Sequence, residues 1–371
     1  MKKKNRSFRL RSLFVKPVSE CTAECDHCTL RREFHSREDD SRSLRLADYQ
    51  ALFPEAARLG VHSLHISGGE PTLFPELAEL VRLGKAQGWF VILNTNGSRP
   101  DRGRIQELLR AGLDAVIVSL QGATPETHDS IRRREGHWKK AVEFIEICRG
   151  FKSEFPHFFL TTQTIITRHN FRELPGIIDR VADCGVDAHG FSYLEADFNC
   201  ASLPGPGEIR ELREKISPAL RERLRAHRFP HPLLRWGALR SLGKIYPGNG
   251  ETVGDYSRGL FRNTPGLAPC PAPEVFALIT ARGWVLPCNM VEYVHAPIMG
   301  NILTRSFTEI WHSPEWDEFR RLRFDWCRFC PVHLHFHIPL NAGLHELLRL
   351  AWKNPAPEQK SISQRIKNAF W

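Results

Sequence analysis

Three cysteines near the start of the sequence, Cys21, Cys25 and Cys28, follow a C-x3-C-x2-C pattern. Three thiolates this close together on one loop can bind three irons of a cubane iron-sulfur cluster and leave the fourth iron without a protein ligand. Such an iron is open to a small molecule. The alternative is a structural zinc site, with His27 as the fourth ligand that zinc needs. We favour the cluster, because a zinc site does not account for the polar residues at the ends of the predicted strands.

A second set of cysteines lies in the last third of the sequence and consists of Cys270, Cys288, Cys327 and Cys330. Ten cysteines in 371 residues are many for a reduced compartment, and their spacing separates metal ligands from disulfides. Because seven of the ten fall into two compact sets, we interpret both sets as metal ligands.

The remaining candidate residues have weaker signals. Cys148 and Cys184 fall on apolar stripes of predicted helices, which predicts buried, unreactive thiols. Cys200 lies in a polar loop after the sixth predicted strand, and we predict it as a hydrogen-atom donor near the substrate. Three alternating histidines follow Cys330, and for these a surface or packing role is favoured over metal binding: His333, His335 and His337.

Residues 10–200 alternate short β-branched runs with amphipathic stretches, which predicts a parallel sheet covered by helices. Six strand-helix units can be counted, with strands near residues 13–19, 62–67, 90–94, 115–119, 159–166 and 189–194. Consecutive right-handed units of this kind predict an α/β fold, a partial (β/α)6 barrel of the TIM type with chemistry at the carboxyl ends of the strands. A helix is predicted over residues 46–59, although Pro54 within it argues against that prediction.

Later segments predict a connector and a small α+β domain. Residues 208–225 are predicted as a charged helix, residues 275–279 and 284–286 as a hairpin, and residues 307–311 and 342–352 as helices. We therefore expect a basic segment (1–16), a core domain (17–200), a connector (201–266), a small iron-sulfur domain (267–338) and a C-terminal helix with a basic tail (339–371).

The formal net charge of +10 is confined to the two ends of the chain. The first 16 residues contain seven lysines or arginines and no acid, the last 21 carry a net +3, and the body between them is neutral. Solvated tails are favoured over specific nucleic-acid binding. No stretch approaches the roughly 18 apolar residues of a membrane span, and no apolar signal-peptide core follows the basic start. We therefore expect a soluble, cytoplasmic protein.

Taken in order, these features resemble the radical S-adenosylmethionine (radical SAM) superfamily over nearly all of residues 10–200. The loop from Cys21 to Cys28 resembles the family's cluster loop, with His27 where an aromatic ring is usual. The segment at the end of the second strand resembles the one that binds the methionine amino group of S-adenosylmethionine (AdoMet). The resemblance thus assigns four residues to cofactor binding: Gly68, Gly69, Glu70 and Pro71. Glycines let a backbone approach closely, and an acid can accept from an ammonium.

The segment after the fourth strand resembles the part of the family in which a serine touches AdoMet and an arginine binds its carboxylate. On this resemblance, Ser119 and Arg132 are assigned to cofactor binding. Gln121 replaces a commoner acidic residue. The run Arg132–Arg134 could also be an exposed helical charge run.

The second cysteine set resembles the auxiliary-cluster domains called SPASM or twitch. Twelve residues separate Cys270 from Gly283 and four separate Gly283 from Cys288, as in that family. Residues 300–302 and 310–311 also match motifs that recur there. No cysteine follows Cys330. The resemblance therefore implies one auxiliary [4Fe-4S] cluster ligated by all four cysteines.

The resemblance implies an enzyme that cleaves AdoMet reductively to a 5′-deoxyadenosyl radical, which abstracts a hydrogen atom from substrate. An electron donor such as flavodoxin or ferredoxin is implied as a partner. Peptide or protein modification is favoured, although the twenty residues before Cys21 leave no room for a fused leader-peptide reader. One alternative is oxidation of a small metabolite of the sugar or aminocyclitol type. The other, of a different class, is a non-catalytic iron-sulfur sensor or nucleic-acid-binding protein.

Overall fold

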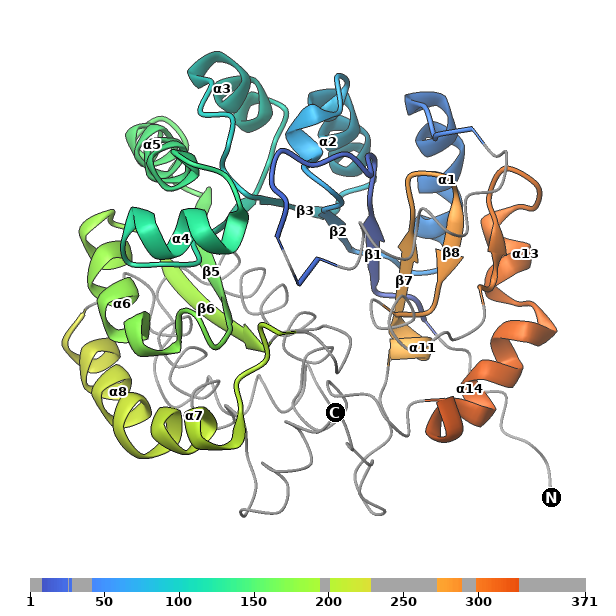
Figure 1. The fold of residues 1–371 in the computed structure, drawn as a ribbon. Helices are drawn as coiled ribbons and strands as arrows, with labels where there is room; N and C mark the ends of the chain where they lie inside the picture. Colours follow the sequence, from blue (N-terminus) through green and yellow to red (C-terminus); the bar gives the residue numbers. More distant parts are fainter. Residues whose placement is uncertain are drawn as a thin grey trace, which may run out of the picture.

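The computed structural model describes residues 9–25, 27–28, 42–193, 201–227, 272–288 and 298–326. A curved sheet of nine strands runs through them in the order β6-β5-β4-β3-β2-β1-β7-β8-β9 (Figure 1). All pairs from β6 to β7 are parallel, and β8 and β9 are antiparallel additions. Helices cover the outer face of the sheet. The predicted α/β fold with a partial barrel is confirmed.

The elements of the barrel follow one another along the chain as predicted. The strands are β1 (Ser12–Val15), β2 (Ser63–Ile66), β3 (Phe90–Thr95), β4 (Ala115–Ser119), β5 (Phe159–Ile166) and β6 (Ala188–Tyr193). The helices are α1 (Leu46–Arg58), α2 (Leu77–Ala86), α3 (Arg102–Arg110), α4 (Pro125–Arg132), α5 (His137–Gly150) and α6 (Leu174–Asp183). Single helical turns lie at η3 (Pro71–Leu73) and η4 (Phe171–Glu173).

After the barrel, the predicted charged helix is present in three parts: α7 (Pro206–Glu211), a π-helical turn η5 (Leu212–Ile216) and α8 (Ser217–Ala226). The C-terminal part contains α11 (Ala272–Val275), β7 (Phe276–Ile279), β8 (Trp284–Leu286), β9 (Gly300–Asn301), α13 (Phe307–Trp311) and α14 (Pro314–Trp326). The predicted hairpin and the helix over 307–311 are therefore confirmed. The helix predicted over 342–352 lies outside the described residues.

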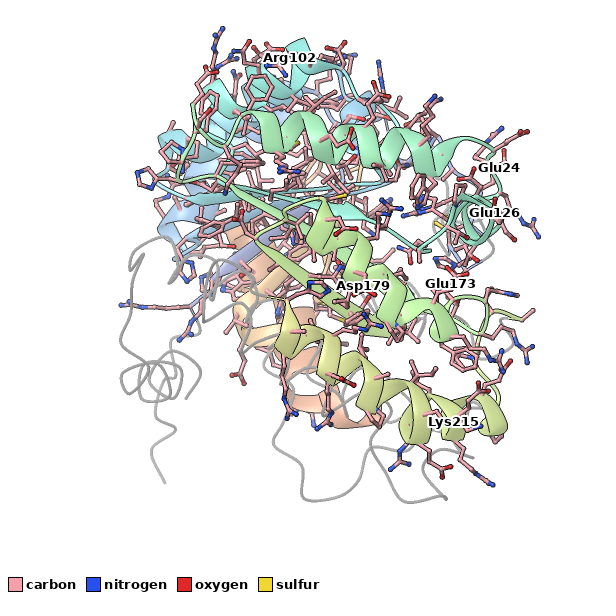
Figure 2. All side chains as sticks on the ribbon, turned by 90° about the vertical axis from the view of Figure 1, so that its left-hand side faces the viewer. Glu24, Arg102, Glu126, Glu173, Asp179 and Lys215 are labelled. Carbon is pink, nitrogen blue, oxygen red and sulfur yellow. The ribbon has the colours of Figure 1, made fainter. Side chains whose placement is uncertain are left out.

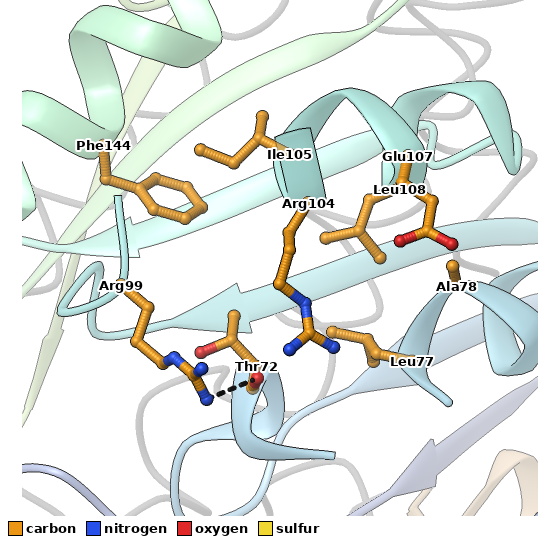
Figure 3. A pocket seen from close by; sticks show the side chains of 9 residues that line it. All are labelled: Thr72, Leu77, Ala78, Arg99, Arg104, Ile105, Glu107, Leu108 and Phe144. Carbon is orange, nitrogen blue, oxygen red and sulfur yellow. Dashed lines mark hydrogen bonds between the residues drawn. The ribbon is translucent and has the colours of Figure 1, made fainter. Parts of the chain in front are cut away.

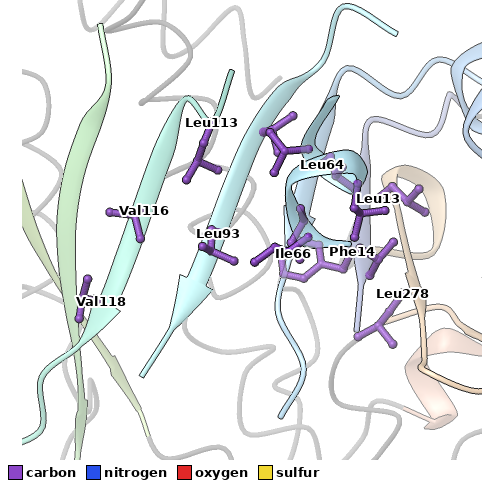
Figure 4. Packing of buried hydrophobic residues seen from close by; sticks show 14 of the residues in the cluster. Leu13, Phe14, Leu64, Ile66, Leu93, Leu113, Val116, Val118 and Leu278 are labelled. Atoms are coloured by element: carbon purple, nitrogen blue, oxygen red, sulfur yellow. The ribbon is translucent and has the colours of Figure 1, made fainter. Parts of the chain in front are cut away.

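The core lies between the sheet and the outer helices. Strands buried on both faces read as nearly unbroken apolar runs, as β4 does with the sequence AVIVS. Leu13 on β1, Leu64 on β2 and Val116 on β4 are completely or almost completely buried and belong to one continuous cluster (Figure 4). This layer holds the strands in register and fixes the positions of the loops at their carboxyl ends.

Helix α1 confirms the helix predicted over residues 46–59 and is continuous through Pro54. Proline inside a helix costs about 3 kcal/mol. Tyr49, Leu52, Phe53 and Ala56 are almost completely buried on one face of the helix. Burial of a large side chain contributes about 1.5–3 kcal/mol, so the packed face offsets the cost of the proline.

Two half-buried ion pairs brace the amino ends of the strands. Asp114, just before β4, accepts from Lys85 Nζ at 2.7 Å and from a backbone N–H of β3 at 2.7 Å. Asp187, just before β6, accepts from Lys152 Nζ at 2.7 Å and from a backbone N–H of β5 at 2.8 Å. The same arrangement thus occurs twice at the end of the barrel opposite the cysteine loop.

Further polar contacts join the helical layer on the side shown in Figure 2. Glu173 accepts from the backbone N–H of Ala123 at 2.9 Å and from the Thr127 hydroxyl, which ties η4 to α4. Asp179 on α6 lies 2.7 Å from His227 Nε2 at the end of α8. The connector helices are therefore attached to the barrel.

In the C-terminal part, Arg320 on α14 joins two elements. Its Nε donates to the Pro273 carbonyl of α11 at 3.0 Å, and the same carbonyl accepts from Trp316 Nε1 at 2.9 Å. The guanidinium also lies 4.5 Å from the centre of the Trp311 ring. Among the described helices, none is long and apolar enough to cross a membrane.

Candidate active site

The cysteine loop lies at the carboxyl end of β1 and is anchored to the end of α4. Cys21 is exposed, Cys25 is buried and Cys28 is half-buried. The backbone N–H of Glu24 donates to the Arg132 carbonyl at 2.9 Å, and the Glu24 carboxylate forms an ion pair with Arg134. The loop therefore sits against the residues predicted to bind AdoMet.

Gly68 and Gly69, at the carboxyl end of β2, let that segment approach the backbone that leads into Cys21. A Cβ on Gly69 would lie 2.0 Å from the Glu20 carbonyl oxygen, and one on Gly68 would lie 2.6 Å from that of Val18. Gly68 also has φ of +134°, which favours glycine. Gly69 N–H donates to the Val18 carbonyl at 3.0 Å. The glycines therefore fix the distance between the β2 loop and the cysteine loop.

The Glu70 side chain is completely buried and is held by four hydrogen bonds. Its carboxylate accepts from the backbone N–H and hydroxyl of Thr72 at 3.1 and 2.7 Å. It also accepts from the Thr95 hydroxyl at 2.7 Å and the Asn96 backbone N–H at 2.8 Å. Pro71 begins the η3 turn immediately afterwards. Glu70 therefore joins the end of β2 to the end of β3.

Arg132 is the buried member of its arginine run. It is only 8% exposed, whereas Arg133 and Arg134 are exposed, because Arg133 takes the left-handed conformation that ends α4. Arg132 Nη1 donates to Cys25 Sγ at 3.4 Å and Nη2 to the carbonyl of Ser119, at the end of β4, at 3.4 Å. Arg132 Nε has no hydrogen-bond partner among the described residues.

A pair of buried histidines packs beside Arg132. His128 Nδ1 accepts from the Gln121 backbone N–H at 3.1 Å, so His128 Nε2 carries the proton and points at His137 Nδ1, 3.2 Å away. Desolvation, reinforced by the Arg132 charge, lowers the pKa of His137 to about 4 and that of His128 well below its usual value. Both rings are therefore neutral at pH 7 and add no charge next to Arg132.

The arrangement of the loop fits an iron-sulfur cluster. Desolvation raises the pKa of the Cys21 thiol, while the Ala23 N–H at 3.5 Å from Sγ and the Arg132 charge act in the opposite direction. Asn96 Nδ2 also lies 3.6 Å from Cys21 Sγ. Within the described part of the chain, no three His, Cys, Asp or Glu side chains are gathered at metal-binding spacing. The observations that fit a cluster are therefore the origin of the three thiols on one loop and the N–H donors directed at their sulfurs.

Of the second cysteine set, only Cys288 lies within the described residues, and it is buried just after β8. The turn before β8 contains Gly283, whose φ is +83°. A Cβ there would lie 2.7 Å from Asn301 Oδ1, and Asn301 Nδ2 donates to the Arg282 carbonyl at 2.9 Å. The glycine and asparagine of the resemblance thus interlock the β7–β8 turn with β9. Cys270, Cys327 and Cys330 lie outside the described residues.

The remaining candidate residues fall into two groups, those that the structure describes and those that lie outside the described residues. Cys148 and Cys184 are buried as predicted, and burial raises the pKa of both thiols. Cys200 and the three alternating histidines lie outside the described residues. Sequence reasoning did not single out Asn96, although its place directly after β3 is a signal that could have found it.

A small cavity lies in the helical layer (Figure 3). It is lined by residues of α2, α3 and α5 and has a volume of about 20 Å³. Arg99 Nη1 donates to the Thr72 carbonyl at its edge, at 3.2 Å. This volume holds about one water molecule, so the cavity is not a cofactor site.

Comparison with known proteins places the chain in a family. The radical SAM superfamily matches residues 15–187, and the SPASM iron-sulfur cluster-binding domain matches residues 270–331. The AdoMet-dependent heme synthase of Methanosarcina barkeri is 27% identical over 82% of both chains. The PqqA peptide cyclase of Methylobacterium nodulans is 28% identical over 86% of this chain and 78% of its own.

Solved structures show the same fold. The crystal structure of Streptococcus suis SuiB bound to precursor peptide SuiA matches with a TM-score of 0.61 and 14% identity, over 84% of this chain and 67% of SuiB. Histidine-tagged anSMEcpe with bound AdoMet also has a TM-score of 0.61, with 18% identity, over 96% of this chain and 98% of its own.

The chain belongs to the radical SAM superfamily and carries a C-terminal SPASM iron-sulfur domain. It is an enzyme whose cofactors are AdoMet, a [4Fe-4S] cluster that binds AdoMet and an auxiliary [4Fe-4S] cluster. The zinc interpretation of the first cysteine set and the non-catalytic alternative are thereby set aside.

Proposed function

We propose that this radical SAM enzyme abstracts a hydrogen atom from a peptide or protein and so modifies it. The observation that carries the proposal is the similarity to PqqA peptide cyclases, which extends over 86% of the chain. The two family models that match the chain span both cysteine sets. A flavodoxin or ferredoxin would supply the electron.

In this proposal Cys21, Cys25 and Cys28 each bind one iron of the first cluster. When bound there, AdoMet is cleaved reductively and supplies the 5′-deoxyadenosyl radical that removes the hydrogen atom. The thiols come from one loop that Glu24 and the β2 glycines hold in place. This loop lies at the carboxyl end of β1, so a cluster held by it would lie at the carboxyl ends of the strands.

Arg132 and the β2 loop bind the methionine end of AdoMet. Arg132 is buried, points toward Ser119 and Cys25, and has an unpartnered Nε among the described residues, which suits a carboxylate ligand. The Glu70 carboxylate already has four donors, so the Gly68 and Gly69 carbonyls are the better acceptors for the methionine ammonium, with Glu70 and Pro71 holding their loop. Ser119 contacts the cofactor from the end of β4.

The four cysteines of the second set ligate the auxiliary cluster in this proposal. Since they fill all its irons, the cluster has no position for a substrate atom and is suited to accepting an electron. Cys200, which follows β6 in the sequence, is the thiol we propose as a hydrogen-atom donor if the reaction is redox-neutral.

Modification of a non-peptide molecule is the second candidate. The AdoMet-dependent heme synthase relative, at 27% identity over 82% of the chain, favours it. A sugar or aminocyclitol, the small-molecule substrate expected from the resemblance, receives no such support, because no relative named above acts on such a compound by its name.

Anaerobic reconstitution tests the ligand assignment. The wild-type protein is expected to hold about eight irons, and replacing Cys21, Cys25 and Cys28 by alanine is expected to leave about four. Cys184→Ala, which removes a buried thiol outside both sets, is the control and should retain all of them. A wild-type iron content in the triple variant would contradict the assignment.

Activity assays distinguish the two substrate classes. Reconstituted protein, dithionite and AdoMet are incubated with candidate precursor peptides from neighbouring genes or with a haem precursor. We expect 5′-deoxyadenosine to rise with a peptide, together with a mass change in that peptide. Stimulation by the haem precursor alone would reject the peptide proposal and support the second candidate.

A further inference from the structure

Asn96 connects the β2 loop to the cysteine loop. It is the first residue after β3, and only 5% of it is exposed. Its backbone N–H donates to Glu70 at 2.8 Å, and its side-chain Nδ2 lies 3.6 Å from Cys21 Sγ and 3.0 Å from the Thr22 hydroxyl. Asn96 is not in the cysteine loop and does not belong to the segments assigned by resemblance.

The orientation of the Asn96 amide is fixed by its neighbours. Its Oδ1 accepts from the backbone N–H of Ser98 at 2.9 Å. A backbone N–H can only donate, so the oxygen of the amide must face Ser98 and the NH2 group must face Cys21. The Thr22 hydroxyl is paired in turn with the Ser98 hydroxyl at 2.6 Å. The N–H donor directed at the sulfur is therefore built into the fold.

Donors directed at cysteine sulfur change the energy of an iron-sulfur cluster. Reduction adds negative charge, and N–H groups directed at the sulfurs stabilise that charge and raise the reduction potential. Around this loop the structure places three such contacts: Asn96 and the Ala23 N–H on Cys21, and Arg132 on Cys25. Arg132 also serves the cofactor and the Ala23 contact is made by backbone, so Asn96 is the contact that a side-chain substitution can isolate.

We propose that Asn96 is a positioning residue that raises the reduction potential of the AdoMet-binding cluster by donating an N–H···S hydrogen bond to Cys21. The inference rests on the proposed ligation by Cys21, which the iron content tests separately. Glu70 contributes indirectly, because it holds the Asn96 backbone. The reduction potential of the cluster thereby depends on the same β2 loop that binds AdoMet.

The test is a redox titration of the reconstituted, AdoMet-free protein, followed by electron paramagnetic resonance. Asn96→Ala removes the donor without adding charge. A hydrogen bond to a charged group changes an equilibrium constant by about one order of magnitude. We therefore expect the first cluster's potential to fall by about 59 mV, the equivalent of a tenfold change for one electron. The auxiliary cluster in the same sample is the internal control and should not shift.

Two further variants separate the hydrogen bond from local packing. Ser98→Ala removes the bond to the Thr22 hydroxyl but keeps the backbone donor that orients Asn96, and it should leave both potentials unchanged. Asn96→Asp keeps the acceptor for Ser98 and replaces the donor by a negative charge, so it should lower the potential more than alanine does. If Asn96→Ala loads less iron than wild type, Asn96→Ser serves for the same comparison. An unchanged potential in a fully loaded Asn96→Ala protein, or an equal shift in both clusters, would overturn the proposal.

Discussion

Replacing Gly69 by alanine probes the close approach between the β2 loop and the cysteine loop. The new Cβ would lie 2.0 Å from the Glu20 carbonyl oxygen and 2.5 Å from that of Ser19. Both obstacles are backbone atoms, so no side-chain rotation relieves the contact. Since Cβ atoms essentially never come within 3.0 Å of another atom, the two segments must separate by about 1 Å.

The loss of stability in Gly69→Ala can be worked out from the backbone hydrogen bonds that this separation breaks. The Gly69 N–H bond to Val18 at 3.0 Å and the Glu70 N–H bond to Glu20 at 2.7 Å are worth about 1 kcal/mol each. Overpacking adds about 1–3 kcal/mol. If the loop instead moves away to avoid this cost, it takes Cys21 with it. We therefore expect a lower melting temperature and the loss of about half of the iron.

Gly88→Ala is the matched control, since Gly88 has φ of +75° but no atom within 4 Å of the added Cβ. This variant should lower the free energy of unfolding by about 1–2 kcal/mol, through backbone strain alone, and should keep the full iron content. Thermal unfolding of the apo-protein and iron per chain are measured for both variants. Wild-type stability together with full iron in Gly69→Ala would refute the reasoning.

The remaining predictions concern cofactor binding, acid stability and the C-terminal part. Arg132→Ala should weaken AdoMet binding at least tenfold without loss of iron, whereas the exposed Arg134→Ala should not; equal affinities by equilibrium dialysis would contradict the assignment. Desolvation lowers the pKa of buried His65 to about 4 and that of His189 to about 3. Below pH 6.5, the ordinary pKa of histidine, these two side chains therefore bind more protons in the unfolded chain than in the folded one. Stability should therefore fall as pH drops from 6.5 toward 4, by about 1.4 kcal/mol per unit for each histidine; denaturant unfolding with a flat profile over that range would be inconsistent with this. Arg320→Met removes the hydrogen bond to α11, so it should lower the free energy of unfolding by about 2–4 kcal/mol and the melting temperature with it. An unchanged unfolding curve would show that Trp316 alone holds the contact.

The sequence predicts the barrel well because its strands have a strong local signal. The strands β2 to β6 all lie within one or two residues of the predicted ranges. Helix α3 was not predicted, since its sequence RGRIQELLR is mostly polar and buries only Ile105, Leu108 and Leu109. Helix α4, with the sequence PETHDSIR, was not predicted for the same reason. Short polar helices are stabilised by packing that periodicity does not reveal.

The sequence motifs identified individual residues of the site, but not the hydrogen bonds that connect them. Glu70 could be picked out beside its glycines, but its partners Thr95 and Asn96 lie 25 and 26 residues further along the chain. Spacing in the sequence carries no information on such contacts. Likewise, the sequence could not separate Arg132 from Arg134, because the left-handed turn at Arg133 that buries one and exposes the other is a feature of the fold.

The pairing of β1 with β7 has a consequence for how the protein is made. Ser12 pairs with Ser63 on one side and with Phe276 on the other, so β1 is synthesised early and its second neighbour very late. Until then the nascent chain presents an open parallel strand edge, which is a template for aggregation. A gene shortened to the radical SAM core would leave that edge open permanently. The C-terminal part therefore protects the strand that leads into the cysteine loop.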